Sequence, residues 1–263
     1  MTMSIDPELQ KQYARDGYLH LPQVLHPEAL SALASELRGL VKDVNKNTEP
    51  MESRSSYKRA FIQVGNLWQQ SDVVRDFVFR ADLAQMASEI MGVSGVRLYH
   101  DQALFKEAGG GATPWHVDQV YWPMDTPQTC TFWIPLQHTP RTMGTLSFAK
   151  GSHHYNDGRK MVISDESESY FNNWVKAQGL DVSNDEFDLG DISVHTGWTV
   201  HRAGPNKTKA NREAMTIIYM AEDARLLQHL TNTQKIDRDA FTPHVQQGGL
   251  LNTSLNPLLY TNQ

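Results

Sequence analysis

The sequence contains one cysteine, Cys130, among 263 residues. A single cysteine cannot form an internal disulfide bond, and it cannot build a cysteine cage around a structural metal. Any metal site in this chain would therefore depend on histidine and carboxylate ligands. The eleven histidines and 30 acidic residues leave ample choice for such a site.

The chain also lacks an excess of positive charge and a long hydrophobic run. It has 24 Lys and Arg against 30 Asp and Glu, a formal net charge of −6, which argues against a nucleic-acid binder held by phosphate contacts. No apolar run approaches the ~20 residues of a membrane span, and residues 1–10 lack the features of a secretory signal. We expect a cytoplasmic protein that binds neither nucleic acid nor membranes. The sequence carries no signal for its oligomeric state.

The N-terminal part, about residues 1–94, is predicted to be largely helical. Asp6 followed by Pro7 is a helix-start signal, and we expect this helix to end near Gly17. Residues 71–92 predict one or two further helices.

From about residue 95 to 222 the pattern changes to short β-rich runs separated by Gly, Pro and Asn clusters. Such recurrence predicts a sandwich, jelly roll or barrel. The expected strands lie at residues 115–121, 129–136, 145–148, 192–195, 198–201 and 215–220. We interpret the polar stretch 152–188 as an insertion whose aromatic residues 170–174 form a lid. Residues 223–263 are a C-terminal extension, and we expect the whole chain, 1–263, to form a single domain.

His116 and Asp118 are the first candidates for chemistry, because they lie two residues apart in the predicted strand 115–121. Residues two apart in a strand point to the same face, so the imidazole and the carboxylate would project side by side. With a third ligand they could form a 2-His-1-carboxylate triad, which leaves metal positions open. A surface His–Asp pair on an edge strand is the alternative. The surrounding aromatic residues favour a pocket.

His201 is the candidate third ligand, and Arg212 follows eleven residues later. We expect a hairpin that places Arg212 beside the strand of His201. A buried arginine that faces a metal pocket needs an anion, and its planar fork suits a carboxylate. An open metal and a carboxylate-binding arginine together describe a site for a 2-oxo acid. The alternative for Arg212 is an exposed loop position.

Several stretches, in order, resemble the phytanoyl-CoA dioxygenase (PhyH-like) family. The string PWHVDQVYWP at residues 114–123 is similar to the metal-binding signature of that family. Other similar segments are HDQALFK at 100–106, GTLSF and GSH within 144–153, and WTVHRAGPN at 198–206 with Arg212. The resemblance implies a mostly β fold with flanking helices, a double-stranded β-helix (jelly roll, cupin-like) preceded by a helical N-terminal region.

The resemblance also implies an activity, that of an Fe(II)- and 2-oxoglutarate-dependent dioxygenase. The implied iron ligands are His116, Asp118 and His201. The implied reaction uses O₂ and 2-oxoglutarate to hydroxylate a C–H bond of a small or medium organic molecule, with release of succinate and CO₂.

For the co-substrate, the resemblance makes Arg212 the partner of the distal carboxylate of 2-oxoglutarate. Gln102 and Trp133 match positions that line the co-substrate pocket. The family often has serine two residues after the distal histidine, where this chain has Ala203. Thr131 is our candidate for the missing hydroxyl, from its place in the strand.

The substrate is the least determined part of this interpretation. Tyr121 and Trp122 follow the His–Asp pair, and we expect them to reach the pocket. Gln63, Asn66 and Trp68 lie in a segment that often covers the site in this family. Their mixture of amides and aromatic rings suggests a partly polar small molecule.

Three alternatives stay open at this point. A related oxygenase could redirect the same chemistry to desaturation, epimerisation or cyclisation. A cupin-like metalloenzyme that needs no 2-oxoglutarate would share the histidine ligands and give Arg212 no role. A binding protein without turnover would need neither an open metal site nor a carboxylate-binding arginine.

Overall fold

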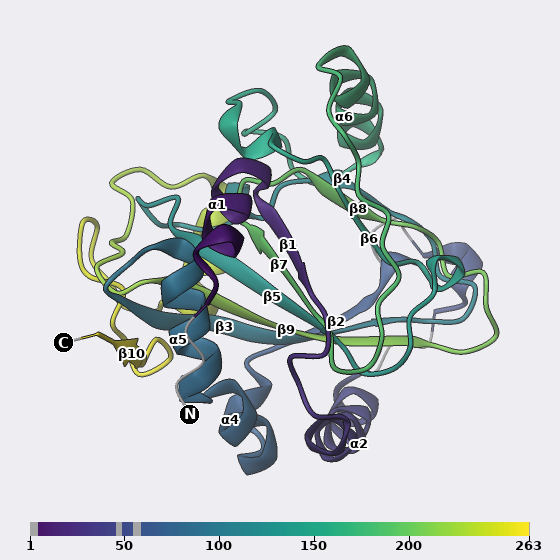
Figure 1. The fold of residues 1–263 in the computed structure, drawn as a ribbon, viewed down its shortest axis with the longest axis horizontal. Coiled ribbons are helices and arrows are strands. Elements are labelled where there is room, and N and C mark those ends of the chain that lie inside the picture. Colours follow the sequence, from purple (N-terminus) through teal and green to yellow (C-terminus); the bar gives the residue numbers. More distant parts are fainter. Residues whose placement is uncertain (1–4, 46–48, 55–58, 263) are drawn as a thin grey trace.

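Two antiparallel β-sheets form the frame of the computed structural model, which describes residues 5–45, 49–54 and 59–262 (Figure 1). The major sheet has the strand order β1 (Tyr18–Leu21), β7 (Ile192–Thr196), β5 (Thr129–Pro135), β9 (Arg212–Ala221), β3 (Gly95–Lys106) and β10 (Leu258–Thr261), and β2 (Ile62–Gly65) also pairs with β3. The minor sheet has the order β4 (Thr113–His116), β8 (His201–Ala203) and β6 (Leu146–Phe148).

Most of the α-helices lie in the N-terminal part, as the sequence predicts. The helices of this part are α1 (Pro7–Asp16), α2 (Pro27–Val44), α4 (Asp72–Val78) and α5 (Ala81–Met91). Two further helices follow later in the chain, α6 (Asp165–Ala177) and α7 (Asn232–Phe241). The Asp6 carboxylate caps α1 by accepting from the Glu8 N–H at 2.9 Å, and Gly17 ends it in a left-handed conformation with φ 69°. Within the described part of the chain, no helix has the length and apolarity needed to cross a membrane.

The two faces of the major sheet have different chemistry. Helices α2, α4 and α5 cover one face, whereas the minor sheet lies on the other (Figure 1). In β5, Phe132 and Ile134 pack into the core under the helices, and the alternate residues Thr131 and Trp133 point toward the minor sheet. The helix-side core therefore supplies the apolar burial, and the opposite face is left for polar groups.

A β-bulge in β3 decides which of its side chains face the minor sheet. The register of β3 with β9 shifts between Leu98 and His100. Leu98 precedes the shift and Phe105 follows it, yet both pack into the helix-side core. The two residues are seven positions apart, which in a regular strand would put them on opposite faces, so the extra residue of the bulge has reversed the alternation. The side chains turned toward the minor sheet are those of His100, Gln102 and Leu104.

Two expected strands differ from the observed ones. The strand predicted at 115–121 ends at His116, and Asp118 begins a 3₁₀ helix, η3 (Asp118–Val120). Val117 between them is still extended, with φ −125° and ψ 140°, so the side chains of His116 and Asp118 leave the chain on the same side. The strand predicted at 198–201 is mostly a turn, and β8 only begins at His201.

The expected hairpin between the strand of His201 and Arg212 does not form. β8 lies in the minor sheet between β4 and β6, whereas β9 lies in the major sheet between β5 and β3. Arg212 is the first residue of β9, and its partner across the sheet is Lys106. The chain therefore crosses from one sheet to the other, and Arg212 approaches from the wall opposite His201.

The aromatic residues of the 152–188 insertion do not form the expected lid. Helix α6 packs against β4, on the side of the minor sheet that faces away from the major sheet (Figure 1). Its Phe171 and Trp174 share a buried apolar cluster with Trp115 and Val200. Burial of these rings against the sheet outweighs exposure over a ligand.

Candidate active site

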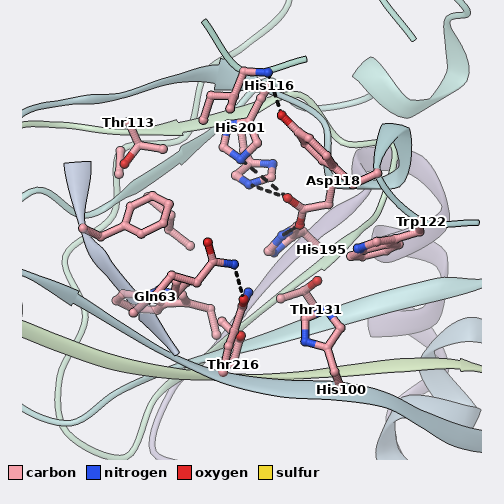
Figure 2. Close-up of a pocket in the computed structure, with 18 of the residues that line it drawn as sticks. Gln63, His100, Thr113, His116, Asp118, Trp122, Thr131, His195, His201 and Thr216 are labelled. Atoms are coloured by element: carbon pink, nitrogen blue, oxygen red, sulfur yellow. Dashed lines mark hydrogen bonds and ion pairs between the residues drawn. The ribbon is translucent and has the colours of Figure 1, made fainter. Parts of the chain in front are cut away.

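A cavity of about 270 Å³ lies between the two sheets (Figure 2). This volume is close to the lower end of the ~300–1,000 Å³ of small-molecule sites. The minor sheet and η3 contribute His116, Asp118 and His201 to its wall, and the major sheet contributes Thr131, His195 and Thr216.

His116, Asp118 and His201 form a cluster at the minor-sheet side of the cavity. His116 and His201 are partners in the antiparallel pairing of β4 with β8, which brings their rings to 4.2 Å between centroids. One carboxylate oxygen of Asp118, Oδ1, lies 3.5 Å from His116 Nε2 and 3.7 Å from His201 Nε2. One ligand atom from each residue lies within 4.8 Å of the other two, so the three can hold one metal ion.

Backbone carbonyls fix the orientation of both histidine rings. Nδ1 of His116 lies 2.7 Å from the Pro114 oxygen, and Nδ1 of His201 lies 2.9 Å from the Thr199 oxygen. A carbonyl only accepts, so each Nδ1 carries the proton and each Nε2 keeps its lone pair for a metal. Burial, together with the neighbouring His116, lowers the pKa of His201 to about 3. His201 is thus neutral at physiological pH, as a metal ligand must be.

A fourth residue, His195, holds the carboxylate of the cluster. Its Nε2 lies 3.3 Å from Asp118 Oδ2, which leaves Oδ1 turned toward the two other histidines. Burial alone would raise the pKa of Asp118, but His201, His116 and His195 together hold it well below its usual range. Asp118 is therefore ionised and oriented before any metal binds.

His195 was not among the candidate residues selected from the sequence. A signal was present, because Ile192 and Val194 alternate with Ser193 and His195 in β7. That alternation predicts one apolar and one polar face for the strand.

Arg212 is a buried cation that has no counter-ion in the described part of the chain. Its side chain is 2% exposed, and it donates to the backbone oxygens of Gly144 at 3.1 Å and Leu104 at 3.2 Å. Among the residues that the structure describes, none forms an ion pair with it, and its Nε has no partner. Burial lowers the pKa of Arg212 to about 10, so it stays charged at neutral pH. Such a group is costly unless an anion binds to it.

Gly144 shows why the GTLSF segment begins with glycine. Its φ is +81°, and a Cβ there would lie 2.4 Å from the Gly204 oxygen. Only glycine tolerates this conformation and this close approach. The resulting path of the chain presents the Gly144 carbonyl to Arg212.

Further polar groups on the major sheet also lack partners. Thr131 Oγ1, Trp133 Nε1 and Thr216 Oγ1 are buried and make no hydrogen bond with any described residue. All three residues line the cavity, as does Gln102, which is hydrogen-bonded to Gln63. Buried donors are normally paired, so this set fits a polar ligand that reaches from Arg212 toward the cluster.

The expected substrate residues separate into two groups. Gln63, Tyr121 and Trp122 line the cavity. The structure does not bring Asn66 and Trp68 there. The Asn66 amide donates to the Ala240 oxygen at 3.4 Å, and the Trp68 ring packs on Phe79 with 5.1 Å between centroids.

Other lining residues were not found from the sequence. Among them are Phe61, His100, Ile163, Thr216, Asp237 and Phe241. Asp237 and Phe241 belong to α7, which nothing in the sequence connects to the β-core. His100 reaches the cavity through the bulge in β3.

Lys106 lies beside Arg212 and is also buried. Its Nζ donates to the Gly111 oxygen and to Thr113 Oγ1, the latter at 3.3 Å. Burial, and secondarily the Arg212 charge, lowers the pKa of Lys106 to about 6. Lys106 is therefore mostly neutral at pH 7, and Arg212 carries the charge of this pair.

The lowered pKa of Lys106 predicts how the stability of the protein depends on pH. In the unfolded chain Lys106 binds its proton up to pH ~10.4, but in the folded protein only below about 6. Between these values the unfolded state binds more protons, so the free energy of unfolding rises with pH. We expect wild type to gain up to about 1.4 kcal/mol per pH unit relative to Lys106→Met, measured by urea unfolding at pH 6.5 to 8.5. Lys42→Met, which changes an exposed lysine, is the control, and its free energy of unfolding should depend on pH as in wild type. If the free energy of unfolding of Lys106→Met also changed with pH in parallel with wild type, the lowered pKa assigned to Lys106 would be wrong.

Comparison with known proteins places the chain in a family. The profile of the family "Phytanoyl-CoA dioxygenase (PhyH)" matches residues 13–214. A probable alpha-ketoglutarate-dependent hypophosphite dioxygenase of Stutzerimonas stutzeri is 23% identical over 230 residues, covering 82% of this chain and 79% of that protein. The dioxygenase lolE1 of Epichloe uncinata is 24% identical over 238 residues, covering 88% of this chain and 86% of that protein.

Solved structures agree over nearly the full length. The non-heme alpha ketoglutarate dependent carbocyclase SnoK has a TM-score of 0.82 with 22% identity, covering 98% of both chains. The epimerase SnoN, in complex with Fe3+, alpha ketoglutarate and nogalamycin RO, has a TM-score of 0.78 with 25% identity, covering 97% of this chain and 100% of that one. The predicted jelly-roll fold with flanking helices is confirmed. Since the family profile covers well over half of the sequence, the chain belongs to the phytanoyl-CoA dioxygenase family.

Proposed function

We propose that this protein is an Fe(II)- and 2-oxoglutarate-dependent dioxygenase that hydroxylates a C–H bond of a small or medium organic molecule. Family membership, the 2-oxoglutarate-dependent relatives and the His–Asp–His cluster all support the dioxygenase activity. One observation carries the proposal: the cluster and an uncompensated buried arginine face the same cavity from opposite walls.

The cluster fits iron in its donor set and in its protonation. His116 and His201 offer neutral Nε2 atoms, and Asp118 offers an ionised oxygen. Two histidines and one carboxylate leave further metal positions for other ligands. When bound there, Fe(II) supplies the redox chemistry by which O₂ and 2-oxoglutarate give succinate, CO₂ and an oxygen atom for the substrate.

The chain's own residues would bind and orient the co-substrate. Arg212 would receive the distal carboxylate of 2-oxoglutarate through its planar fork. Thr131 and Trp133 carry buried donors without partners on the same wall, and they would complete its hydrogen bonding. Thr131 would thus take the place of the hydroxyl that Ala203 lacks. Because Arg212 stays fixed by two backbone carbonyls, little reorganisation accompanies binding.

Hydroxylation is the specific reaction that we propose, and two other reactions are the alternatives to it. The two solved relatives are described as a carbocyclase and an epimerase, so cyclisation and epimerisation are specific alternatives. Turnover under ¹⁸O₂ separates them, because only hydroxylation leaves labelled oxygen in the main product.

We also propose that residues 1–263 form one domain with three parts: a helical part of about 1–94, a core of about 95–222 and an extension of 223–263. Strands β1 and β2 before the core and β10 after it all pair into the major sheet, which supports this organisation. A cytoplasmic location stays a prediction from the sequence.

Replacing the carboxylate ligand should remove iron binding. Asp118→Ala deletes one of three ligands, and changes even to supporting residues of metal sites cost ~10–100-fold in affinity. We expect a larger loss in anaerobic equilibrium dialysis with Fe(II), together with loss of 2-oxoglutarate-dependent O₂ consumption. The exposed Asp125→Ala is the matched control and should behave as wild type. Full activity of Asp118→Ala would show that the triad is assigned incorrectly.

Replacing the arginine should affect the co-substrate and leave the metal unchanged. Arg212→Lys keeps the charge but loses the fork, and a charge-assisted hydrogen bond contributes ~1.5–3 kcal/mol. We expect the KM for 2-oxoglutarate to rise about 10–100-fold, measured by succinate release, while Fe(II) affinity stays at the wild-type value. Arg202→Lys is the control, because the Arg202 guanidinium packs over the Trp115 ring, 4.6 Å from its centroid, and does not line the cavity. An unchanged KM in Arg212→Lys would favour an enzyme that does not use an oxo acid.

A further inference from the structure

We propose that the substrate of this site carries a positively charged amine or ammonium group, and that Asp237 binds it. The inference rests on the proposed function and names the chemical class of the substrate. It starts from Asp237 and the aromatic rings around it, none of which the metal or the co-substrate uses.

Helix α7 holds Asp237 at the cavity through three contacts. The Tyr99 hydroxyl donates to Asp237 Oδ2. The Gln234 amide donates to the Trp122 oxygen at 3.4 Å, and the Phe241 ring stacks on His100 with 4.0 Å between centroids and 18° between planes. These contacts hold the Asp237 carboxylate in a fixed position in the cavity wall, although α7 comes from the C-terminal part of the chain.

Asp237 lies at the end of the cavity away from Arg212. On β3, Leu104 accepts from Arg212, whereas His100, four residues earlier, contacts Phe241 of α7. At ~3.3 Å per residue, four residues of a strand span roughly 13 Å. The two charged groups thus occupy different ends, and the co-substrate carboxylate at Arg212 does not account for Asp237.

Among the residues that the structure describes, none serves as a counter-ion for Asp237. Its Oδ1 forms no hydrogen bond or ion pair with any residue in 5–45, 49–54 or 59–262. Arg212 is the one Lys or Arg among the described residues that line the cavity. His100 is neutral, because burial lowers its pKa to about 4. Burial also raises the pKa of Asp237 to about 7, which reflects how poorly the empty site stabilises the anion.

The charges of the loaded site point the same way. The charges of Fe(II) and Arg212 together balance Asp118 and the two carboxylates of 2-oxoglutarate. In its ionised form, Asp237 is then left as an uncompensated negative charge. A cationic substrate group would neutralise it, whereas an anionic substrate would add to the imbalance.

The walls at this end suit a cation as well. Three aromatic side chains line the cavity near Asp237: Tyr121, Trp122 and Phe241. Ring faces attract ammonium groups, and alkylated ammonium ions are recognised in this way. One carboxylate among three aromatic rings therefore selects a substituted amine over a carboxylic acid or phosphate.

A matched pair of compounds tests this without knowledge of the natural substrate. Choline and 3,3-dimethylbutan-1-ol have the same shape, and they differ by a charged nitrogen in place of a carbon. Their binding to metal-free protein is measured by saturation-transfer NMR, and their binding to the Fe(II)- and 2-oxoglutarate-loaded protein by anaerobic calorimetry. We expect wild type to prefer choline about tenfold or more.

The variant Asp237→Asn keeps the size of the side chain and an acceptor for Tyr99, but it removes the charge. We expect it to bind the two compounds equally. Asp239→Asn removes a neighbouring exposed carboxylate that pairs with Arg238, and it should keep the wild-type preference. If Asp237→Asn does not fold, the comparison of the two compounds on wild type alone decides.

Equal binding of both compounds to wild type, absence of choline binding, or a preference that survives in Asp237→Asn would overturn the proposal. A hydroxyl-recognition role for Asp237 would give the first of these results. The metal-free measurement does not depend on iron chemistry, so a failure here is distinct from a failure of 2-oxoglutarate-dependent O₂ consumption.

Discussion

The buried charge of Arg212 is the constraint on which the site depends. A guanidinium group without a counter-ion destabilises the empty protein, and only a well-packed structure can hold it in place. The apolar core between the helices and the major sheet provides that packing on the other face of the same strands. In the proposed function, this unpaired charge would bind the anionic co-substrate.

The two faces of the major sheet divide stability and chemistry between them. In β5, Phe132 packs under the helices while Thr131 and Trp133 face the cavity with unpaired donors. The bulge in β3 extends this division by turning His100 and Gln102 inward. Across the cavity, the pairing of β4 with β8 sets the two histidine ligands side by side. Each polar group therefore depends on strand register more than on local sequence.

This dependence explains what sequence alone could and could not predict. His116 and Asp118 are neighbours in the chain, and an extended Val117 is enough to place them together, so their pairing was predictable even though the strand ends early. Arg212 was predicted to bind a carboxylate, but the hairpin that was to bring it there is wrong, because β8 and β9 lie in different sheets. Asp237 could not be predicted, since its place depends on the docking of α7.

In the proposed function, iron and Arg212 hold opposite ends of one 2-oxoglutarate molecule. The most direct measurement is an anaerobic titration of the metal-free protein with Fe(II) and then 2-oxoglutarate, followed by visible absorption. Our account predicts a weak charge-transfer band that appears only with both components and saturates at one equivalent of each. Absence of the band in folded, iron-loaded protein would contradict the account.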